Sequence, residues 1–242
     1  MTETSPQFDP FPDDWQTALC IAAHPDDLEY GTAGAVAAWT RAGKTVTYLL
    51  ATSGEAGIDG LDPAECGPVR EAEERAAAAE VGVDAVEFLG YPDGVVEYGL
   101  PLRRDIARVV RRRRPDLVVA GNPDVRPAWG AIDYADHRAV NLAAVDGVRD
   151  AGNRWVFRDL LGEGLEPWKV RYTALAMSPR ASHAVDVTGT MEAGVASLNA
   201  HRRYLAGLGG DPTDADGMLR GIASMVGQRF GGRLAVAFEI LR

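Results

Sequence analysis

Short apolar runs alternate with amphipathic segments over the first 150 residues, and this rhythm restricts the fold more than any other feature. The expected strands are 17–23, 45–52, 85–89 and 117–120, and the expected helices are 31–42, 69–81, 101–113 and 136–150. A strand followed by a helix and a further strand is the unit from which parallel sheets are built. The pattern therefore predicts an α/β fold with a Rossmann-like, mostly parallel sheet flanked by helices.

The pattern changes after residue 150. Two strands are expected near 170–177 and 184–188, helices near 190–207 and 214–226, and a last strand near 233–241. With 242 residues, of which 46% are hydrophobic, the chain can bury one large core. We expect one domain over residues 1–242, in which 1–150 form a Rossmann-like half and 151–242 form a smaller α+β extension that completes the sheet and a substrate pocket.

Charge and composition exclude several classes of partner. The formal net charge of −10 argues against nucleic acid, because non-specific binding to phosphate backbones is mainly electrostatic. The sequence has no run of about 18 apolar residues and no basic segment at its acidic N-terminus, so neither a membrane span nor a secretory signal is expected. We expect a cytoplasmic protein in which Cys20 and Cys66 are free thiols. A homo-oligomer is left open.

Candidate metal ligands stand where the first strand ends. His24 and Asp27 follow the apolar run 17–22, and His137 begins a later helix at the same edge of the sheet. Ligands bind in open α/β sheets outside the carboxyl ends of the strands. Catalytic zinc takes about three histidine and carboxylate ligands. We therefore expect Zn²⁺ on His24, Asp27 and His137, with Fe²⁺, Ni²⁺ or Co²⁺ as alternatives.

Asp26 is left over from this ligand set and is a candidate general base. A simpler interpretation exists for both carboxylates, because acidic residues after Pro25 also satisfy free N–H groups at a helix start. That interpretation does not explain His24 or His137. The loop after the first strand lacks Gly-x-Gly-x-x-Gly, so a dinucleotide cofactor is not expected.

Six motifs occur in a fixed order over residues 17–150. They are His24-Pro25-Asp26-Asp27 with Gly31 and Gly34, Thr52-Ser53-Gly54-Glu55, Arg70-Glu71-Ala72-Glu73, Tyr91-Pro92-Asp93-Gly94, Arg114-Pro115-Asp116-Leu117-Val118-Val119 and Asp136-His137-Arg138-Ala139-Val140. In order and spacing they resemble the PIG-L/LmbE-like zinc-dependent de-N-acetylases, whose members include deacetylases of the mycothiol and bacillithiol pathways. The stretch Ser197-Leu198-Asn199-Ala200-His201 resembles the family's C-terminal pattern more weakly.

The resemblance implies a zinc-dependent hydrolase that removes an acyl group, usually acetyl, from the amine of an aminosugar or similar small hydroxylated molecule. It assigns zinc to His24, Asp27 and His137 and the general base to Asp26. It also implies that Glu55, Arg70 and Asp93 bind substrate hydroxyls. Ordinary alternatives are a helical salt bridge from Arg70 to Glu73 or Glu74 and a turn at Asp93.

Tyr134 departs from the family pattern, which often has a histidine at this position to stabilise the oxyanion. A phenol can donate a hydrogen bond but, with a pKa of about 10, is not a cationic acid near neutrality. We expect Tyr134 to act as a neutral donor, with His183 and His201 as alternatives. Two other functions stay open: an amidase of mycothiol-type thiol conjugates, and a weakened module that binds a metal or small molecule.

Overall fold

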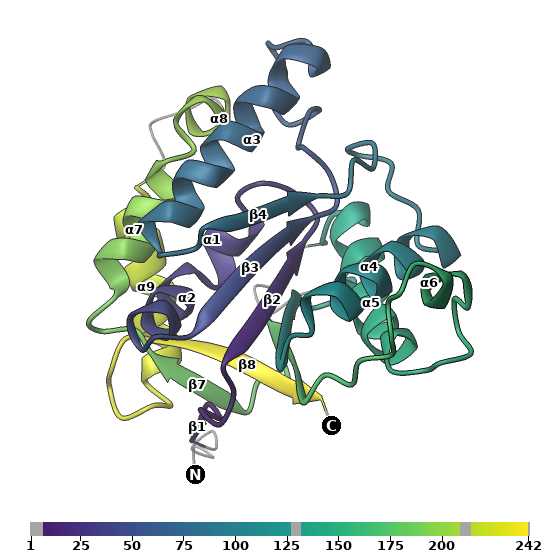
Figure 1. Cartoon of the computed structure of the whole chain (residues 1–242). Helices are drawn as coiled ribbons and strands as arrows, with labels where there is room; N and C mark the ends of the chain where they lie inside the picture. Colours follow the sequence, from purple (N-terminus) through teal and green to yellow (C-terminus); the bar gives the residue numbers. More distant parts are fainter. Residues whose placement is uncertain (1–6, 127–131, 209–213, 242) are drawn as a thin grey trace.

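The computed structural model describes residues 7–126, 132–208 and 214–241, and its described strands form one sheet (Figure 1). The sheet order is β1-β7-β8-β6-β5-β2-β3-β4. The strands are β1 (Asp9–Pro10), β2 (Thr17–Ala22), β3 (Thr45–Leu50), β4 (Ala85–Phe88), β5 (Leu117–Gly121), β6 (Tyr172–Ala176), β7 (His183–Asp186) and β8 (Ala235–Leu241). All pairs are parallel except those of β8 with β6 and β7. The predicted α/β fold with a mostly parallel sheet is confirmed.

Helices cover both faces of this sheet. They are α1 (Asp27–Gly31), α2 (Ala33–Arg41), α3 (Pro63–Glu80), α4 (Leu100–Arg113), α5 (Ala135–Ala151), α6 (Asp159–Gly162), α7 (Met191–Asn199), α8 (Arg202–Gly207) and α9 (Ala215–Gly227). Figure 1 shows α4, α5 and α6 on one side and α2, α3, α7 and α9 on the other. In β2, Cys20 and Ala22 belong to one buried core, and Leu19 and Ile21 belong to the other. Burial on both faces explains the continuous apolar run of this strand.

One expected helix is interrupted in the structure. The helix expected over 190–207 is α7 and α8, separated at Ala200–His201, where His201 has a ψ of 53°. The apolar periodicity runs across this break, and the prediction of a single helix was wrong. The helix expected over 31–42 is present as α2, and the short α1 before it, which ends where Thr32 has a φ of −139°, was not predicted.

The sequence pattern also misplaced one helix start. The helix expected over 69–81 begins at Pro63, because Asp62 caps it by accepting a hydrogen bond from the Ala64 amide. Pro68 lies inside this helix at its sixth residue, where it cannot donate the backbone hydrogen bond that the Ala64 carbonyl would otherwise accept. The short elements β1 and α6 were not predicted, and both are too short to give a periodic signal.

The topology fixes where a site can form. β2 pairs with β3 on one side and with β5 on the other, so chain connections diverge on either side of its carboxyl end. The segments after residue 151 supply β6, β7 and β8 to the same sheet. Cys20 and Cys66 are buried free thiols, as predicted. Within the described ranges, no helix has the length and apolarity that crossing a membrane requires.

Candidate metal centre

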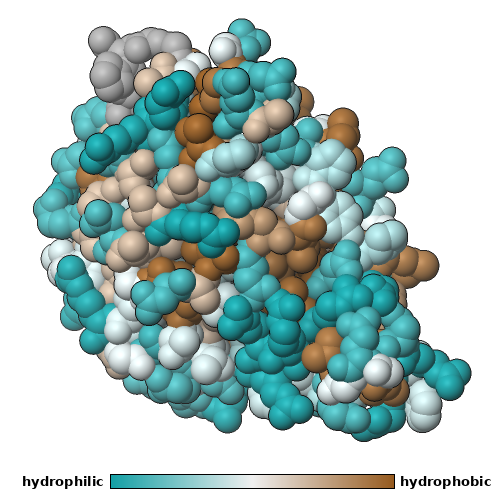
Figure 2. Space-filling view, turned by 45° about the horizontal axis from the view of Figure 1, so that its top comes forward, coloured by the Kyte–Doolittle hydropathy of each residue, from teal (hydrophilic) through white to brown (hydrophobic). Residues whose placement is uncertain are grey.

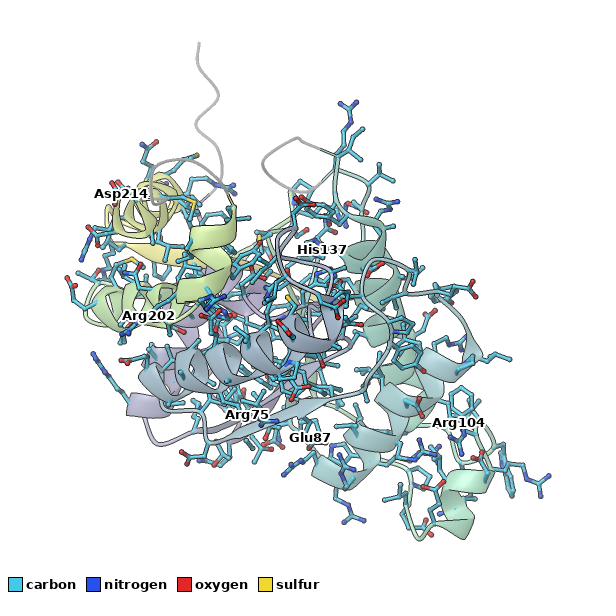
Figure 3. The ribbon with its side chains drawn as sticks, turned by 90° about the horizontal axis from the view of Figure 1, so that it is seen from above. Arg75, Glu87, Arg104, His137, Arg202 and Asp214 are labelled. Carbon is cyan, nitrogen blue, oxygen red and sulfur yellow. The ribbon has the colours of Figure 1, made fainter. Side chains whose placement is uncertain are left out.

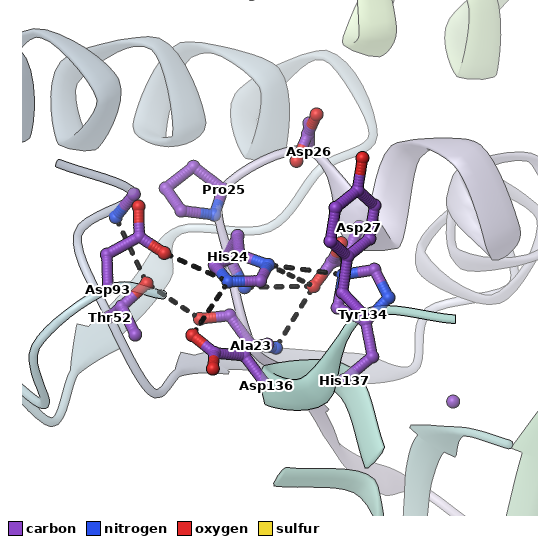
Figure 4. A network of polar contacts seen from close by, with 12 residues as sticks. Ala23, His24, Pro25, Asp26, Asp27, Thr52, Asp93, Tyr134, Asp136 and His137 are labelled. Carbon is purple, nitrogen blue, oxygen red and sulfur yellow. Dashed lines mark hydrogen bonds and ion pairs between the residues drawn. The ribbon is translucent and has the colours of Figure 1, made fainter. Parts of the chain in front are cut away.

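Three side chains converge beyond the end of β2 and form a compact set of metal donors (Figure 4). His137 Nε2 lies 3.2 Å from His24 Nδ1 and 3.0 Å from Asp27 Oδ1, and His24 Nδ1 lies 3.5 Å from Asp27 Oδ2. Ligand atoms bonded to a tetrahedral ion at about 2.0–2.2 Å are about 3.3–3.6 Å apart. The donor types and spacings therefore suit one divalent metal ion.

The backbone between β2 and α1 brings these donors together. Asp27 is the first residue of α1, and its Oδ2 accepts hydrogen bonds from the amides of Ala23 and His24. His137 lies in the first turn of α5. Figure 3, a view from above, shows His137 near the centre of the molecule. The loop that precedes α5 is described only in part, since residues 127–131 lie outside the described ranges.

Each histidine of this set has a carboxylate on its other ring nitrogen. His24 Nε2 lies 3.0 Å from Asp93 Oδ1 and 3.3 Å from Asp136 Oδ2, and His137 Nδ1 lies 2.7 Å from Asp133 Oδ1. Such carboxylates fix the tautomer and ring orientation of metal-binding histidines. Sequence reasoning did not assign this role to Asp133 or Asp136. The four-residue spacing of Asp133 and His137 at a helix start could have indicated it.

The surrounding carboxylates make both imidazoles strongly basic in the metal-free protein. Burial lowers the pKa of His24, but hydrogen bonds to Asp136, Asp27 and Asp93 outweigh burial and raise the pKa to about 12. For His137, burial is outweighed by the charge of Asp27 and the bond to Asp133, and the pKa rises to about 10. Burial raises the pKa of Asp27, but the two histidines hold it well below its usual range. A metal must therefore displace protons.

We expect metal binding to release about two protons per ion at pH 7 to 8. Both histidine pKa values lie above this range, so the imidazoles are charged before binding and neutral afterwards. Metal affinity should accordingly increase with pH, by up to about a hundredfold per unit. Calorimetric titration with Zn²⁺ in buffers of different ionisation enthalpy measures the released protons. A value of zero would contradict this protonation state.

Asp26 lies apart from the donor set. Its φ of 96° is left-handed, a strained conformation for a residue with a side chain, and Figure 4 shows its carboxylate away from the contacts that join His24, Asp27 and His137. The carboxylate is buried and lies 3.1 Å from Arg70 Nη2. Burial raises the pKa of Asp26 to about 6, although the Arg70 charge opposes the rise. The Asp26 amide donates to Glu74 Oε2 at 3.1 Å.

Arg70 is enclosed by the protein. It is 2% exposed, its guanidinium contacts Asp26 and the Pro25 carbonyl, and it lies 3.8 Å from the centre of the Tyr204 ring. A Cβ at Gly57 would approach its Nη1 to 2.2 Å, so the missing side chain leaves the room that the guanidinium occupies. The ion pair joins Arg70 to Asp26, and not to Glu73 or Glu74 as in the ordinary alternative to substrate binding.

Glu55 and Asp93 also have internal partners. Glu55 Oε1 accepts from the Asp93 amide at 2.9 Å, and Asp93 Oδ2 accepts from the Ala56 amide at 2.8 Å. Asp93 thus links the turn after β4 to His24. The assignment of Glu55, Arg70 and Asp93 to substrate binding stays a prediction. The structure adds that Arg70 contacts Asp26, that Asp93 contacts His24, and that Glu55 holds the turn of Asp93.

Tyr134 differs from the two alternative histidines in its exposure. It precedes α5, is 75% exposed, and its ring lies edge-on to that of His137 with centroids 5.3 Å apart. His201 is fully buried, 3.5 Å from Glu29 and 3.6 Å from Glu74, and so has no surface that a substrate can contact. His183 lies in β7, which β8, β6 and β5 separate from β2. The geometry therefore favours Tyr134 over both histidines.

Comparison with known proteins identifies the family. Residues 19–148 match the family model described as PIG-L, GlcNAc-PI de-N-acetylase. The chain belongs to this family. It is 30% identical to diacetylchitobiose deacetylase of Thermococcus kodakarensis, over 94% of this chain and 83% of that protein. A 1D-myo-inositol 2-acetamido-2-deoxy-alpha-D-glucopyranoside deacetylase of Mycobacterium sp. (strain KMS) is also 30% identical, over 78% of this chain and 74% of its own length.

Solved structures agree with this assignment. N,N'-diacetylchitobiose deacetylase from Pyrococcus horikoshii superimposes with a TM-score of 0.86 and 27% identity, over 94% of this chain and 84% of that one. The conserved protein TT1542 from Thermus thermophilus has a TM-score of 0.75 and 26% identity, over 91% and 92% of the two chains. The family expected from the six motifs is confirmed.

Proposed function

We propose that this chain is a metal-dependent N-deacetylase that removes an acetyl group from the amine of an aminosugar or a similar small hydroxylated molecule. The convergence of His24, Asp27 and His137 beside the separate carboxylate of Asp26 carries this proposal. The names of the relatives support it, since they describe deacetylases of chitobiose and inositol glycosides bearing acetylated amines. Metal-dependent amide hydrolysis uses a Lewis acid and a base, and this site offers places for each.

We propose Zn²⁺ as the metal, held by His24, Asp27 and His137, because two imidazoles and one carboxylate form a typical catalytic zinc set. Fe²⁺, Ni²⁺ and Co²⁺ accept the same donors. Bound there, the ion would supply a Lewis acid that polarises the substrate carbonyl and lowers the pKa of water to about 7. Asp93, Asp136 and Asp133 would keep the two imidazoles oriented toward it.

Asp26 would perform the proton transfers. Its carboxylate takes a proton from the attacking water as the C–O bond forms, and gives that proton to the leaving amine as the C–N bond breaks. A base with a pKa of about 6 is largely ionised at neutral pH and still accepts protons readily. The ion pair with Arg70 and the hydrogen bond from the Asp26 amide to Glu74 would hold Asp26 in its strained conformation.

Tyr134→Phe should lower kcat by about 10²–10³-fold, the usual cost of losing one oxyanion donor. The reason is that the exposed phenol beside His137 would donate a hydrogen bond to the carbonyl oxygen as it gains charge. Steady-state kinetics with unchanged metal content would measure this. Tyr134→His should restore activity but add a decline at alkaline pH, since imidazolium loses its proton near pH 6.5. Full activity of Tyr134→Phe would remove the tyrosine from the mechanism.

The experiment that tests the proposed function is a substrate panel. The metal-loaded protein is incubated with N-acetylglucosamine, N,N'-diacetylchitobiose and N-acetylated cysteine conjugates, and mass spectrometry follows acetate and free amine. We expect release from the aminosugars. Preference for the cysteine conjugates would favour the thiol-conjugate amidase, and metal binding without turnover of any compound would favour the binding module.

We further propose that residues 1–242 act as one domain in the cytoplasm on a small N-acylated molecule. The strands that follow residue 151 support this, because they extend the sheet that carries the metal centre. Size-exclusion chromatography with light scattering measures whether the protein forms a homo-oligomer.

A further inference from the structure

An apolar cavity adjoins the metal centre. It has a volume of about 320 Å³ and is bounded by Asp27 and His137 on the side of the metal donors. Most of its remaining wall is apolar and includes Ile21, Leu28, Ala120, Met177, Met218 and Ile222. These apolar residues come from β2, α1, β5, the end of β6, and α9. A polar part of the wall is formed by Tyr30, Thr32, Asn122, Asp133 and Asn141. The cavity therefore lies at the carboxyl ends of the central strands, under one helix of the C-terminal extension.

A second cavity of about 550 Å³ continues the first. The two share Tyr30, Thr32, Met177 and Ile222 as lining residues, and the second extends between α7, α9 and β8. Ile222 is 46% exposed, so this region also reaches solvent at α9. Hydrophobic side chains occur in groups on the largely hydrophilic face that Figure 2 shows. Together the two cavities provide an elongated apolar space that starts at the metal donors.

Met177 stands where the cavities meet. Its φ of 55° is left-handed, which is uncommon for a residue with a side chain and is found preferentially at functional sites. A Cβ at Gly31 would lie 2.5 Å from Met177 Cε, so the glycine makes room for the methionine. Methionine is flexible and adapts to apolar ligands of different length. A ligand in the first cavity could therefore extend past Met177.

This space is larger than an acetyl group requires, and most of its wall is apolar. One water molecule or methylene-sized group takes about 30 Å³, so the first cavity alone accommodates about ten such groups. The methyl group of acetyl would fill a small part of it. Sugar hydroxyls that face the aliphatic part of the wall would lose their hydrogen bonds to water there.

We propose that the cavity receives the acyl chain of the substrate, and that the enzyme hydrolyses N-acyl amines with linear chains of about four to eight carbons. This inference rests on the proposed function of the same metal centre. Water adds its oxygen to the acyl carbon, the C–N bond breaks, and the products are the alkanoate and the free amine. The cavity borders Asp27 and His137, whereas the polar groups Asp93 and Asp136 contact His24. The acyl and amine parts would thus lie on different sides of the donor set.

The test compares glucosamine acylated with acetyl, butanoyl, hexanoyl or octanoyl groups, using the metal-loaded protein and release of free amine. We expect kcat/KM to increase about threefold to fourfold for each added methylene until the cavity is filled. Hydrolysis of the acetyl compound alone would overturn the acyl-chain inference and leave the proposed function intact. Turnover of none of the four would contradict the proposed function.

Binding of the products gives a readout that does not depend on turnover. Calorimetry with the metal-loaded protein should show that octanoate binds at least tenfold more tightly than acetate. Equal affinities would overturn the inference whatever the kinetics show. The alternative occupant of the cavity is an alkyl aglycone of the sugar. Octyl N-acetylglucosaminide tests it, because this compound carries its chain on the sugar and not on the acyl group. If kcat/KM increased for this compound and not for the longer acyl groups, the cavity would be assigned to the aglycone.

Ile222→Trp would fill the cavity from α9, where the partly exposed position allows a larger side chain. We expect the ratio of octanoyl to acetyl kcat/KM to fall at least tenfold. Leu142→Trp is the matched control, because Leu142 is 41% exposed on α5 and does not line either cavity. An unchanged ratio in a folded Ile222→Trp protein would contradict the inference, and thermal melting verifies the fold.

Discussion

Asp26→Asn is expected to lower kcat by roughly 10²–10⁴-fold and to leave the metal content unchanged, because it removes a general base without removing a ligand. Asparagine has the size of aspartate and tolerates the left-handed backbone that Asp26 adopts, so the turn should keep its shape. Metal analysis and single-turnover kinetics measure the two effects separately. Asp84→Asn, at an exposed position, is the matched control.

The pH profile of the wild-type protein gives a second test of Asp26. Its pKa lies above the unperturbed value because of burial, so the carboxylate is protonated as the pH falls through about 6 in the metal-free protein. A bound cation would move this value downward. We therefore expect kcat/KM to decline on the acid side at or below pH 6. Loss of metal from Asp26→Asn would show that Asp26 is a ligand.

His137→Ala and Asp27→Ala are expected to lose the metal and with it all measurable turnover, since each supplies one of three donors. Asp133→Asn should have a smaller effect than these two variants, because it changes only the partner of His137 Nδ1. We expect it to weaken metal affinity by about 10–100-fold. Competition with a zinc chelator ranks the variants, and circular dichroism verifies folding. Full metal content in folded His137→Ala would place the ion elsewhere.

The arrangement of the central strands could be predicted because each is buried on both faces and reads as a continuous apolar run. The break at His201 could not, because it depends on packing and does not interrupt the apolar periodicity. His201 leaves the helical conformation where it is buried against Glu29 and Glu74, which come from α1 and α3. Contacts between elements so distant in sequence leave no local signal.

In the candidate site, too, some contacts could be predicted from the sequence and others could not. The convergence of His24, Asp27 and His137 could be predicted because His24 and Asp27 follow a central strand and His137 starts a helix at the same sheet edge. The partner of Arg70 could not, because nothing in its own helix indicates that its guanidinium meets Asp26, which lies 44 positions earlier in the sequence. The same limit applies to the contacts of Asp93 and Asp136 with His24.

A crystal structure of the metal-loaded protein, with anomalous scattering recorded at the absorption edge of the metal, tests the central claim most directly. We predict one strong peak per chain within bonding distance of His24 Nδ1, His137 Nε2 and a carboxylate oxygen of Asp27, with Asp26 uncoordinated. A peak at the buried group of Glu29, Glu74 and His201, or at His24 with Asp93 and Asp136, would contradict the account.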